Sequence, residues 1–317
     1  MSSGESYQGL ENKSLLNLLI LFSEKIFEVI YMGIVGGLVV IICVFGGFLL
    51  AGGHLHVIWQ PFEVMIIGGA ALGGFIIQNP IARIKLAIKM AIHALFGKPP
   101  AKSDYLELLQ MMFQLFQIFR KDGPQAVEKH IEEPHSSEIF KAYPSFIKNH
   151  HALDFLCDTM KITLSADLSQ YDVDDLLGDD IKVAHEEEHG AQHAISAVAD
   201  AMPGLGIVAA VLGIVHTMDY LDQGVQTIGG LVAAALVGTF LGILMSYGFL
   251  SPLAGKMGAD AEAEGRYLSV IKAAMVALQR GAPPLVCVEF ARRSIYPSER
   301  PTFEEMDTAT KEGKKAA

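Results

Sequence analysis

One short motif in this chain has the residue types of a metal-dependent hydrolase. His185, Glu186 and His189 satisfy the pattern H-E-x-x-H, which on a helix places two imidazoles on one face to bind zinc, with the glutamate as general base. His193 follows one turn later. The motif lies in an acidic run that leads directly into an apolar segment, and such short patterns also arise by chance. We therefore keep a membrane metalloprotease as the weaker alternative and expect no catalytic residue, metal or cofactor.

Two apolar stretches in the C-terminal third carry a different signal. Residues 207–215 and 228–247 contain no Asp, Glu, Lys or Arg. A proton or ion path through lipid normally needs an ionisable residue at membrane depth. If these helices conduct protons or ions, another chain must therefore supply the carboxylate. We expect the four apolar helices of this chain to form the carboxylate-free half of a proton-conducting complex.

The polar groups left in these stretches are few. Thr239 carries a hydroxyl group well inside the stretch 228–247. A hydrogen bond from this hydroxyl to its own helix backbone explains the residue as well as a functional role does. Residues 206–213 have no side-chain oxygen. A dehydrated sodium ion needs several oxygen ligands, whereas a proton needs one titrating group, so the pattern favours protons.

The overall composition is that of a membrane protein with a large water-facing part. Hydrophobic residues make up 51% of the chain and the mean hydropathy is +0.36, yet 19% of the residues are charged. The formal net charge of -11 argues against nucleic-acid binding, which needs a basic surface. The cysteines, Cys43, Cys157 and Cys287, have no paired spacing that would suggest a metal site.

Hydropathy predicts four membrane-spanning helices of about 20 residues each. The two short links between them contain neither Lys nor Arg, so the positive-inside rule places both links outside the cytoplasm. The N-terminal segment, the central segment and the tail then share the cytoplasmic side. We expect an all-α integral membrane protein, with four transmembrane helices in two hairpins and a large helical cytoplasmic domain. The predicted spans are 33–51, 62–79, 202–218 and 228–250, the links are 52–61 and 219–227, and the cytoplasmic segments are 1–32, 80–201 and 251–317.

Turn and cap signals divide the cytoplasmic part into helices. Asp104 and Glu107 have capping-box spacing and predict a helix start, and Gly123 followed by Pro124 predicts its end. Residues 15–22 favour an interfacial helix over a signal peptide. Residues 308–317 have the composition of a disordered tail.

Small residues and prolines mark the apolar stretches. The G-x-x-x-G patterns 69–73 and 238–242, with Gly206 and Gly213, indicate closely packed helices and a tight oligomer. Pro203 and Pro252 flank the apolar stretches, where a proline either begins or ends a helix or serves as a bending point. Both interpretations stay open on the sequence alone.

Arg120 and Glu128 stand on either side of the Gly-Pro break. Exposed charges of this kind contribute little to stability. If they have a role, it is to steer and register a charged partner, which does not require burial.

Four longer segments are specific enough to indicate a family. The segments MPGLGIVAAV (202–211), VGTFLGIL (237–244), YGFLSPLA (247–254) and SERPTF (298–303) closely resemble the MotA stator subunits of the bacterial flagellar motor, in the MotA/TolQ/ExbB proton channel family. The likeness covers nearly everything after Met32. The added residues before Met32 leave two readings open, a start at Met32 or an extra interfacial helix.

The resemblance implies a role and partners. It implies a homo-pentamer in the bacterial inner membrane around two copies of MotB, whose Asp carries the proton, with N- and C-termini cytoplasmic. By resemblance, Arg120 and Glu128 match the charges that engage the rotor protein FliG, and Pro203 and Pro252 match prolines that couple ion passage to movement. Thr239 and Ala210 match ion-path positions, where sodium-type relatives carry Thr instead of the Ala. The alternative is an ExbB or TolQ type energiser of outer-membrane processes, which usually has three spans rather than the four predicted here.

Overall fold

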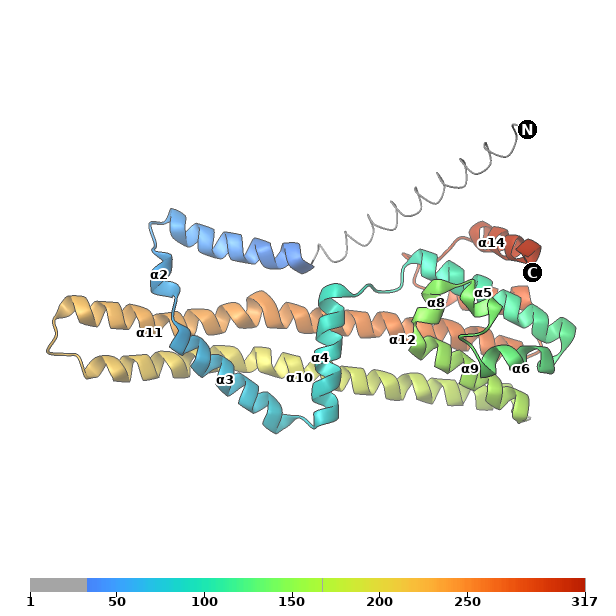
Figure 1. Ribbon diagram of the computed structural model, residues 1–317, viewed down its shortest axis with the longest axis horizontal. Coiled ribbons are helices and arrows are strands. Elements are labelled where there is room, and N and C mark those ends of the chain that lie inside the picture. The colour runs from blue at the N-terminus through green and yellow to red at the C-terminus, as the bar shows by residue number, and fades with distance from the viewer. Residues whose placement is uncertain (1–32, 167, 317) are drawn as a thin grey trace, which may run out of the picture. The chain divides into compact units, whose positions relative to one another are not determined.

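The structure, a computed structural model, describes residues 33–166 and 168–316, and in that part of the chain it consists of helices without a strand (Figure 1). The predicted interfacial helix at 15–22 lies outside the described residues. The helices are Gly33–Leu50, α2 Leu55–Ile58, α3 Pro61–Gln78, α4 Ile81–Phe96, α5 Lys102–Asp122, α6 Pro124–Glu132, α7 Glu138–Lys141, α8 Pro144–Lys148, α9 His150–Ser165, α10 Gln170–Met218, α11 Val225–Met245, the π-helical turn η1 Ser246–Leu250, α12 Ser251–Gln279, α13 Pro284–Arg293 and α14 Phe303–Ala316.

The helices form two compact units. The first comprises the chain up to Lys98 together with Glu188–Asp260, and the second comprises Pro99–Glu187 with the chain from Ala261 onward. Helices α10 and α12 contribute residues to both units.

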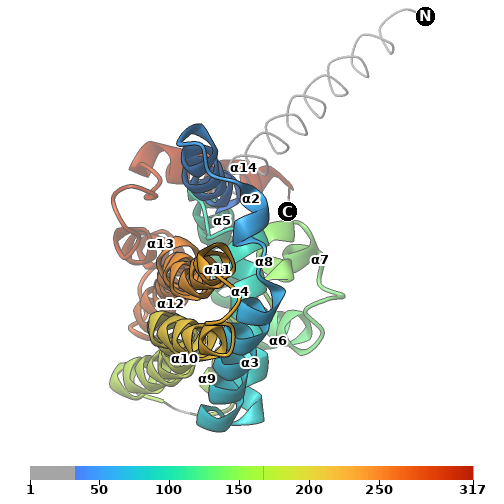
Figure 2. The same cartoon turned by 90° about the vertical axis from the view of Figure 1, so that its left-hand side faces the viewer.

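The first unit contains the apolar helices. Four helical segments of the described chain are long and apolar enough to cross a membrane, which confirms the predicted number of apolar helices. Helix α3 lies against the pair formed by α10 and α11 (Figures 1 and 2), where Ile67 and Ala71 of α3 pack on Met202 and Ala209 of α10. The four segments are Gly33–Leu50, Leu55–Gln78, Gln170–Met218 and Val225–Gln279.

The second unit has a core of buried apolar side chains around α5. Residues at helical spacing on α5, among them Leu108, Leu109, Met112 and Phe116, are fully or almost fully buried against apolar residues from α6, α9, α12 and α13. Helix α5 ends where the sequence predicts, because Gly123 adopts a left-handed φ of 87° and Pro124 begins the next helix.

The predicted start of α5 is confirmed to within two residues, but the capping contacts differ from the predicted pairing of Asp104 with Glu107. Helix α5 begins at Lys102, so Asp104 is its third residue rather than its cap, and its carboxylate accepts a hydrogen bond from the Ala101 N–H at 2.8 Å. Glu107 instead accepts from the Ser145 N–H at 2.8 Å, a contact 38 residues away that sequence spacing does not reveal.

Residues 308–316, the described part of the predicted disordered tail, are helical. Helix α14 packs on α5, with Met306 and Thr310 buried one turn apart and the Gln110 amide donating to the Ala309 carbonyl at 2.9 Å. Tertiary contact therefore overrides the weak local signal of residues 308–317, because two inward side chains are enough to dock one face of a helix.

Candidate functional site

The predicted ion-path residues Ala210 and Thr239 lie on two helices that touch backbone to backbone. A Cβ added to Gly206 on α10 would stand 2.8 Å from the Gly238 carbonyl oxygen and 3.3 Å from the Thr239 Cα, and one added to Gly238 would stand 3.3 Å from the Ala210 nitrogen. Only glycine permits this approach. The 238–242 glycine pattern thus joins α11 to α10 within one chain, and it brings Ala210 and Thr239 to the same level.

The other glycine pattern has no such partner. Cβ atoms added to Gly69 or Gly73 on α3 would meet nothing within 4 Å among the described residues. In this structure the helix contact predicted from small residues is therefore formed by Gly238 and Gly242 and not by the 69–73 segment.

Thr239 does not donate to its own helix backbone the hydrogen bond that would explain its hydroxyl structurally. Within the described residues, Thr217 on α10 donates to the Gly213 carbonyl at 2.8 Å, as a helical threonine commonly does, whereas no hydrogen bond involves the Thr239 hydroxyl. The half-buried Thr239 side chain is therefore available to a ligand or to a partner.

Pro203 lies inside a helix rather than at its end. Helix α10 runs unbroken from Gln170 to Met218, so the reading of Pro203 as a helix start is wrong. A proline in this position removes one backbone donor and crowds the carbonyl four residues earlier. The Met202 carbonyl oxygen faces α11, and a Cβ on Gly242 would be only 2.6 Å from it.

Pro252 also lies within a continuous helix, directly after a π-helical turn. In η1 the Ser251 N–H donates to the Ser246 carbonyl five residues earlier, which widens the helix before the position where Pro252 has no N–H to offer. Pro252 is ten residues beyond Gly242, so along a straight helix it lies about 15 Å from the level of Pro203. The structure does not bring the two prolines together.

One ionisable residue at this site was missed by the sequence prediction. Glu63 on α3 is only 8% exposed, and its carboxylate faces α10 and α11. A Cβ on Gly238 would stand 2.8 Å from its Oε2, and one on Gly213 would stand 3.5 Å from its Oε1. The expectation of carboxylate-free helices is therefore wrong. The signal was present in the sequence, because the predicted span 62–79 already included Glu63.

Arg120 has local partners in the second unit. Its guanidinium donates to the Gly281 carbonyl and, at 3.0 Å, to the Ala282 carbonyl, so it links the end of α5 to the turn between α12 and α13. Gly281 occupies a left-handed φ of 78° in this turn. Arg120 remains exposed, as expected for a residue that meets a partner, but it also holds the turn in place.

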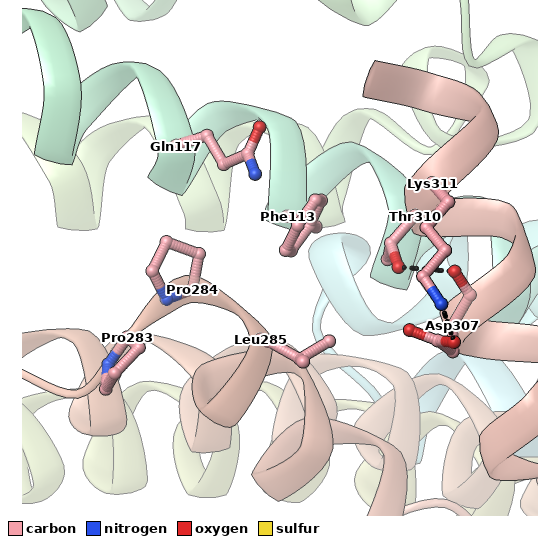
Figure 3. A pocket seen from close by; sticks show the side chains of 8 residues that line it. All are labelled: Phe113, Gln117, Pro283, Pro284, Leu285, Asp307, Thr310 and Lys311. Carbon is pink, nitrogen blue, oxygen red and sulfur yellow. Dashed lines mark hydrogen bonds and ion pairs between the residues drawn. The ribbon is translucent and has the colours of Figure 1, made fainter. Parts of the chain in front are cut away.

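Glu128 is exposed on α6, which packs on α5, so the two predicted rotor-facing charges lie on adjacent helices. A shallow hollow of about 290 Å³ lies in the same unit, next to the turn that Arg120 holds (Figure 3). Its walls come from α5, α13 and α14, and include Phe113, Pro284 and Lys311.

The H-E-x-x-H motif lies on α10, with His185, Glu186 and His189 all exposed. Among the described residues, no group of three His, Cys, Asp or Glu side chains is placed to hold a metal ion. The three-ligand site that a zinc hydrolase needs is thus not assembled by this part of the chain.

Comparison with known proteins identifies two family regions. Residues 34–123 match the family described as motility protein A N-terminal, and residues 148–269 match the MotA/TolQ/ExbB proton channel family. Two solved structures share the fold: the Campylobacter jejuni MotAB structure, with a TM-score of 0.72, 19% identity and coverage of 86% of this chain and 99% of that chain, and the Bacillus subtilis flagellar MotAB stator complex, with a TM-score of 0.65, 20% identity and coverage of 81% and 92%.

Relatives of higher identity span the same region of the chain. Motility protein A of Salmonella typhimurium is 38% identical over 275 residues, which cover 86% of this chain and 93% of that protein, and the Escherichia coli protein is 36% identical over the same shares. Chemotaxis protein LafT of Vibrio parahaemolyticus is 35% identical over 86% of this chain and 95% of its own length. The chain therefore belongs to the motility protein A family, within the MotA/TolQ/ExbB proton channel family.

Proposed function

We propose that this chain is the stator subunit of a bacterial flagellar motor and that, with MotB, it forms a proton-conducting complex that turns the rotor. The observation that carries this proposal is the glycine-lined contact of α10 and α11, which brings Ala210 and the unbonded Thr239 to one level in helices whose apolar stretches contain no Asp, Glu, Lys or Arg. Such a surface conducts protons when a carboxyl group lies against it, and in this proposal MotB supplies the main one.

The partner supplies the main proton carrier. Structural neighbours of this chain are solved as MotAB complexes. By the family resemblance, the membrane helix of MotB contains the Asp that carries the proton. Holding an ionised carboxylate in an apolar site costs several kcal/mol, and protonation removes that cost. Each protonation therefore changes which packing of the helices is favoured.

Pro203 and Pro252 are the points where α10 and the continuous α11–α12 helix can bend when protonation changes the favoured packing. Both lie inside continuous helices with a missing backbone hydrogen bond, and Pro252 follows a π-helical turn. Each elementary charge that crosses the membrane releases about 2.3 kcal/mol per 100 mV of membrane potential. This free energy is enough to bias two helix packings of similar energy, but not to unfold a helix.

In this proposal five copies of the chain surround two copies of MotB in the bacterial inner membrane. Both links, 52–61 and 219–227, face the periplasm, and the N- and C-termini and the segment 80–201 face the cytoplasm, an orientation that the positive-inside rule favours. The coupling ion is the proton, and no other cofactor takes part.

Torque passes to the rotor through charge contacts with FliG. Arg120 and Glu128 are exposed and lie on the adjacent helices α5 and α6, so a charged surface of the rotor can meet both. The hydrogen bonds of Arg120 to Gly281 and Ala282 hold its side chain in a fixed position. A fixed position favours repeated contact with the rotor surface in the same alignment.

The alternative, an ExbB or TolQ type energiser, has less support. The N-terminal family region is that of motility protein A, and the described part of the chain has four apolar helices rather than three. Deletion of the gene separates the two readings. We expect loss of spreading in soft agar with normal siderophore-dependent iron uptake. The reverse result would favour the energiser.

Proton conduction is tested with both chains in vesicles. We expect an imposed gradient to drive proton entry into vesicles that contain this chain and MotB, and to drive none when the intramembrane Asp of MotB is changed to Asn. Flux through this chain alone, at the rate of the full complex, would contradict the proposal.

A further inference from the structure

We infer that Glu63 is a second proton-binding group of the complex, contributed by this chain, and that protons pass through its carboxyl on their way along the α10–α11 surface. The inference rests on the proposed function and extends it, because that function assigns proton binding to the partner alone.

The first argument is depth. Glu63 stands at the start of α3, but its carboxylate faces Gly213 and Gly238. Gly238 is thirteen residues from the start of α11 and seven from its end, or about 20 Å and about 10 Å along the helix. The 21 residues of α11 match the thickness of a bilayer's hydrocarbon core, so the carboxylate lies well inside the membrane-spanning segment.

The second argument is the absence of a structural partner. Glu63 Oε2 is buried and forms no hydrogen bond with any described residue. A glutamate at the third position of a helix usually reaches back to cap the first turn, but here the side chain enters the contact between α10 and α11 instead. A buried carboxylate without a hydrogen bond or a countercharge is costly, whereas its protonated form carries no charge.

The third argument is its neighbours. The position of a Cβ on Gly238 is 2.8 Å from Glu63 Oε2 and 3.3 Å from the Ala210 nitrogen, and Thr239 is the next residue on α11. The carboxyl group thus lies at the level of both predicted ion-path residues. An intramembrane ionisable side chain in such a place marks an ion pathway by default.

The chemistry needs no other reactant. An O–H bond forms at Oε2 when the carboxylate takes a proton from water on the side of higher proton activity. The same bond breaks when the proton passes to the ionised carboxylate of the partner, which returns Glu63 to its starting state.

The test uses the complex with MotB in vesicles and compares two variants, one without the acid and one that keeps it. Glu63→Gln keeps the size and polarity of the side chain but cannot carry an exchanging proton, and Glu63→Asp keeps the acid. We expect Glu63→Gln to lower the proton flux by at least about tenfold and Glu63→Asp to retain most of it. Co-purification with MotB checks assembly, and the Asp→Asn variant of MotB is run beside them.

Each outcome supports or overturns either the inference about Glu63 or the proposed function. An assembled Glu63→Gln complex with flux within about twofold of the wild type overturns the inference while leaving the proposed function intact. Flux that persists in the MotB variant defeats the proposed function itself. Should Glu63→Gln fail to assemble, infrared difference spectra of Glu63→Asp against the wild type decide: a protonated-carboxyl band that moves between the two supports the inference, and identical spectra overturn it.

Discussion

At the scale of single residues, burial controls the chemistry of two thiols in the second unit. Cys157 and Cys287 are buried, and burial raises the pKa of Cys157 to about 12 and that of Cys287 to about 11. Both are therefore uncharged thiols near neutral pH, without the thiolate needed for reaction.

We expect neither thiol to react with a maleimide in the folded protein at pH 7.5, and both to react after denaturation. Mass spectrometry of the labelled peptides measures this. A Ser136→Cys variant, which places a thiol at an exposed position of the same unit, is the positive control. Rapid labelling of Cys287 in the native chain would show that the contact of α13 with the core opens readily.

Glu289 is the charged residue whose environment changes its acidity most clearly. Hydrogen bonds from Arg292 at 2.7 and 2.9 Å, with a further one from Arg293 at 2.7 Å, lower the pKa of the Glu289 carboxyl to about 2 despite burial, which acts in the opposite direction. Arg292 also donates to the Pro301 carbonyl at 3.0 Å, so the cluster ties α13 to the segment before α14.

Glu289→Gln should lower the stability of the purified chain at pH 7 by about 1 to 3 kcal/mol. Because the folded pKa is depressed, the stabilisation is present above the unfolded value near 4.5 and is lost as pH falls toward about 2. The gap in thermal midpoint between variant and wild type should thus be constant from pH 7 to pH 5 and shrink below that. A gap that widens in acid would disprove this account.

At the scale of helices, the contact of α10 with α11 depends on the absence of side chains. A Cβ on Gly242 would be 2.6 Å from the Met202 carbonyl oxygen, which is backbone and cannot rotate away. Gly204, two residues from Met202 and about half a turn away on α10, has nothing within 4 Å of its added Cβ among the described residues.

Gly242→Ala should therefore destabilise the chain by about 1 to 3 kcal/mol, because the two helices must separate. Gly204→Ala is the matched control, and it should be neutral or stabilising by up to about 1 kcal/mol through helix propensity. Thermal unfolding in detergent, with proton flux as a second measurement, compares them. Equal effects of the two variants would mean that the helices do not touch at Gly242.

Helix α14 gives a second test at this scale. Met306→Ala removes a fully buried side chain and should cost about 2 to 4 kcal/mol. Glu304→Ala, an exposed position on the same helix, should change stability by less than about 0.5 kcal/mol. Protease digestion of the tail reports the same difference. If both variants leave the tail equally protected, α14 does not depend on Met306.

At the scale of the whole molecule, the proposed function requires two partners: one within the membrane and one that meets the charges Arg120 and Glu128. Glu128→Lys should reduce swimming to less than about a tenth of the wild-type rate, because a reversed charge repels the surface it should attract. Glu132→Lys makes the same change at an exposed position of the same helix and should keep at least about half of that rate. Tracking of single cells measures both, and a similar loss in the two variants would point to general charge rather than to a specific contact.

The sequence by itself determined the number of apolar helices, the end of α5 at Gly123 and Pro124, and the family, because these depend on local composition, backbone geometry and the order of residues. Only the tertiary structure decided that Glu63 faces Gly213 and Gly238, that Arg120 holds the turn at Gly281, and that Met306 docks α14. Each of these joins residues far apart in the chain, and the free energy of such contacts comes from burial and from hydrogen bonds that no local window contains.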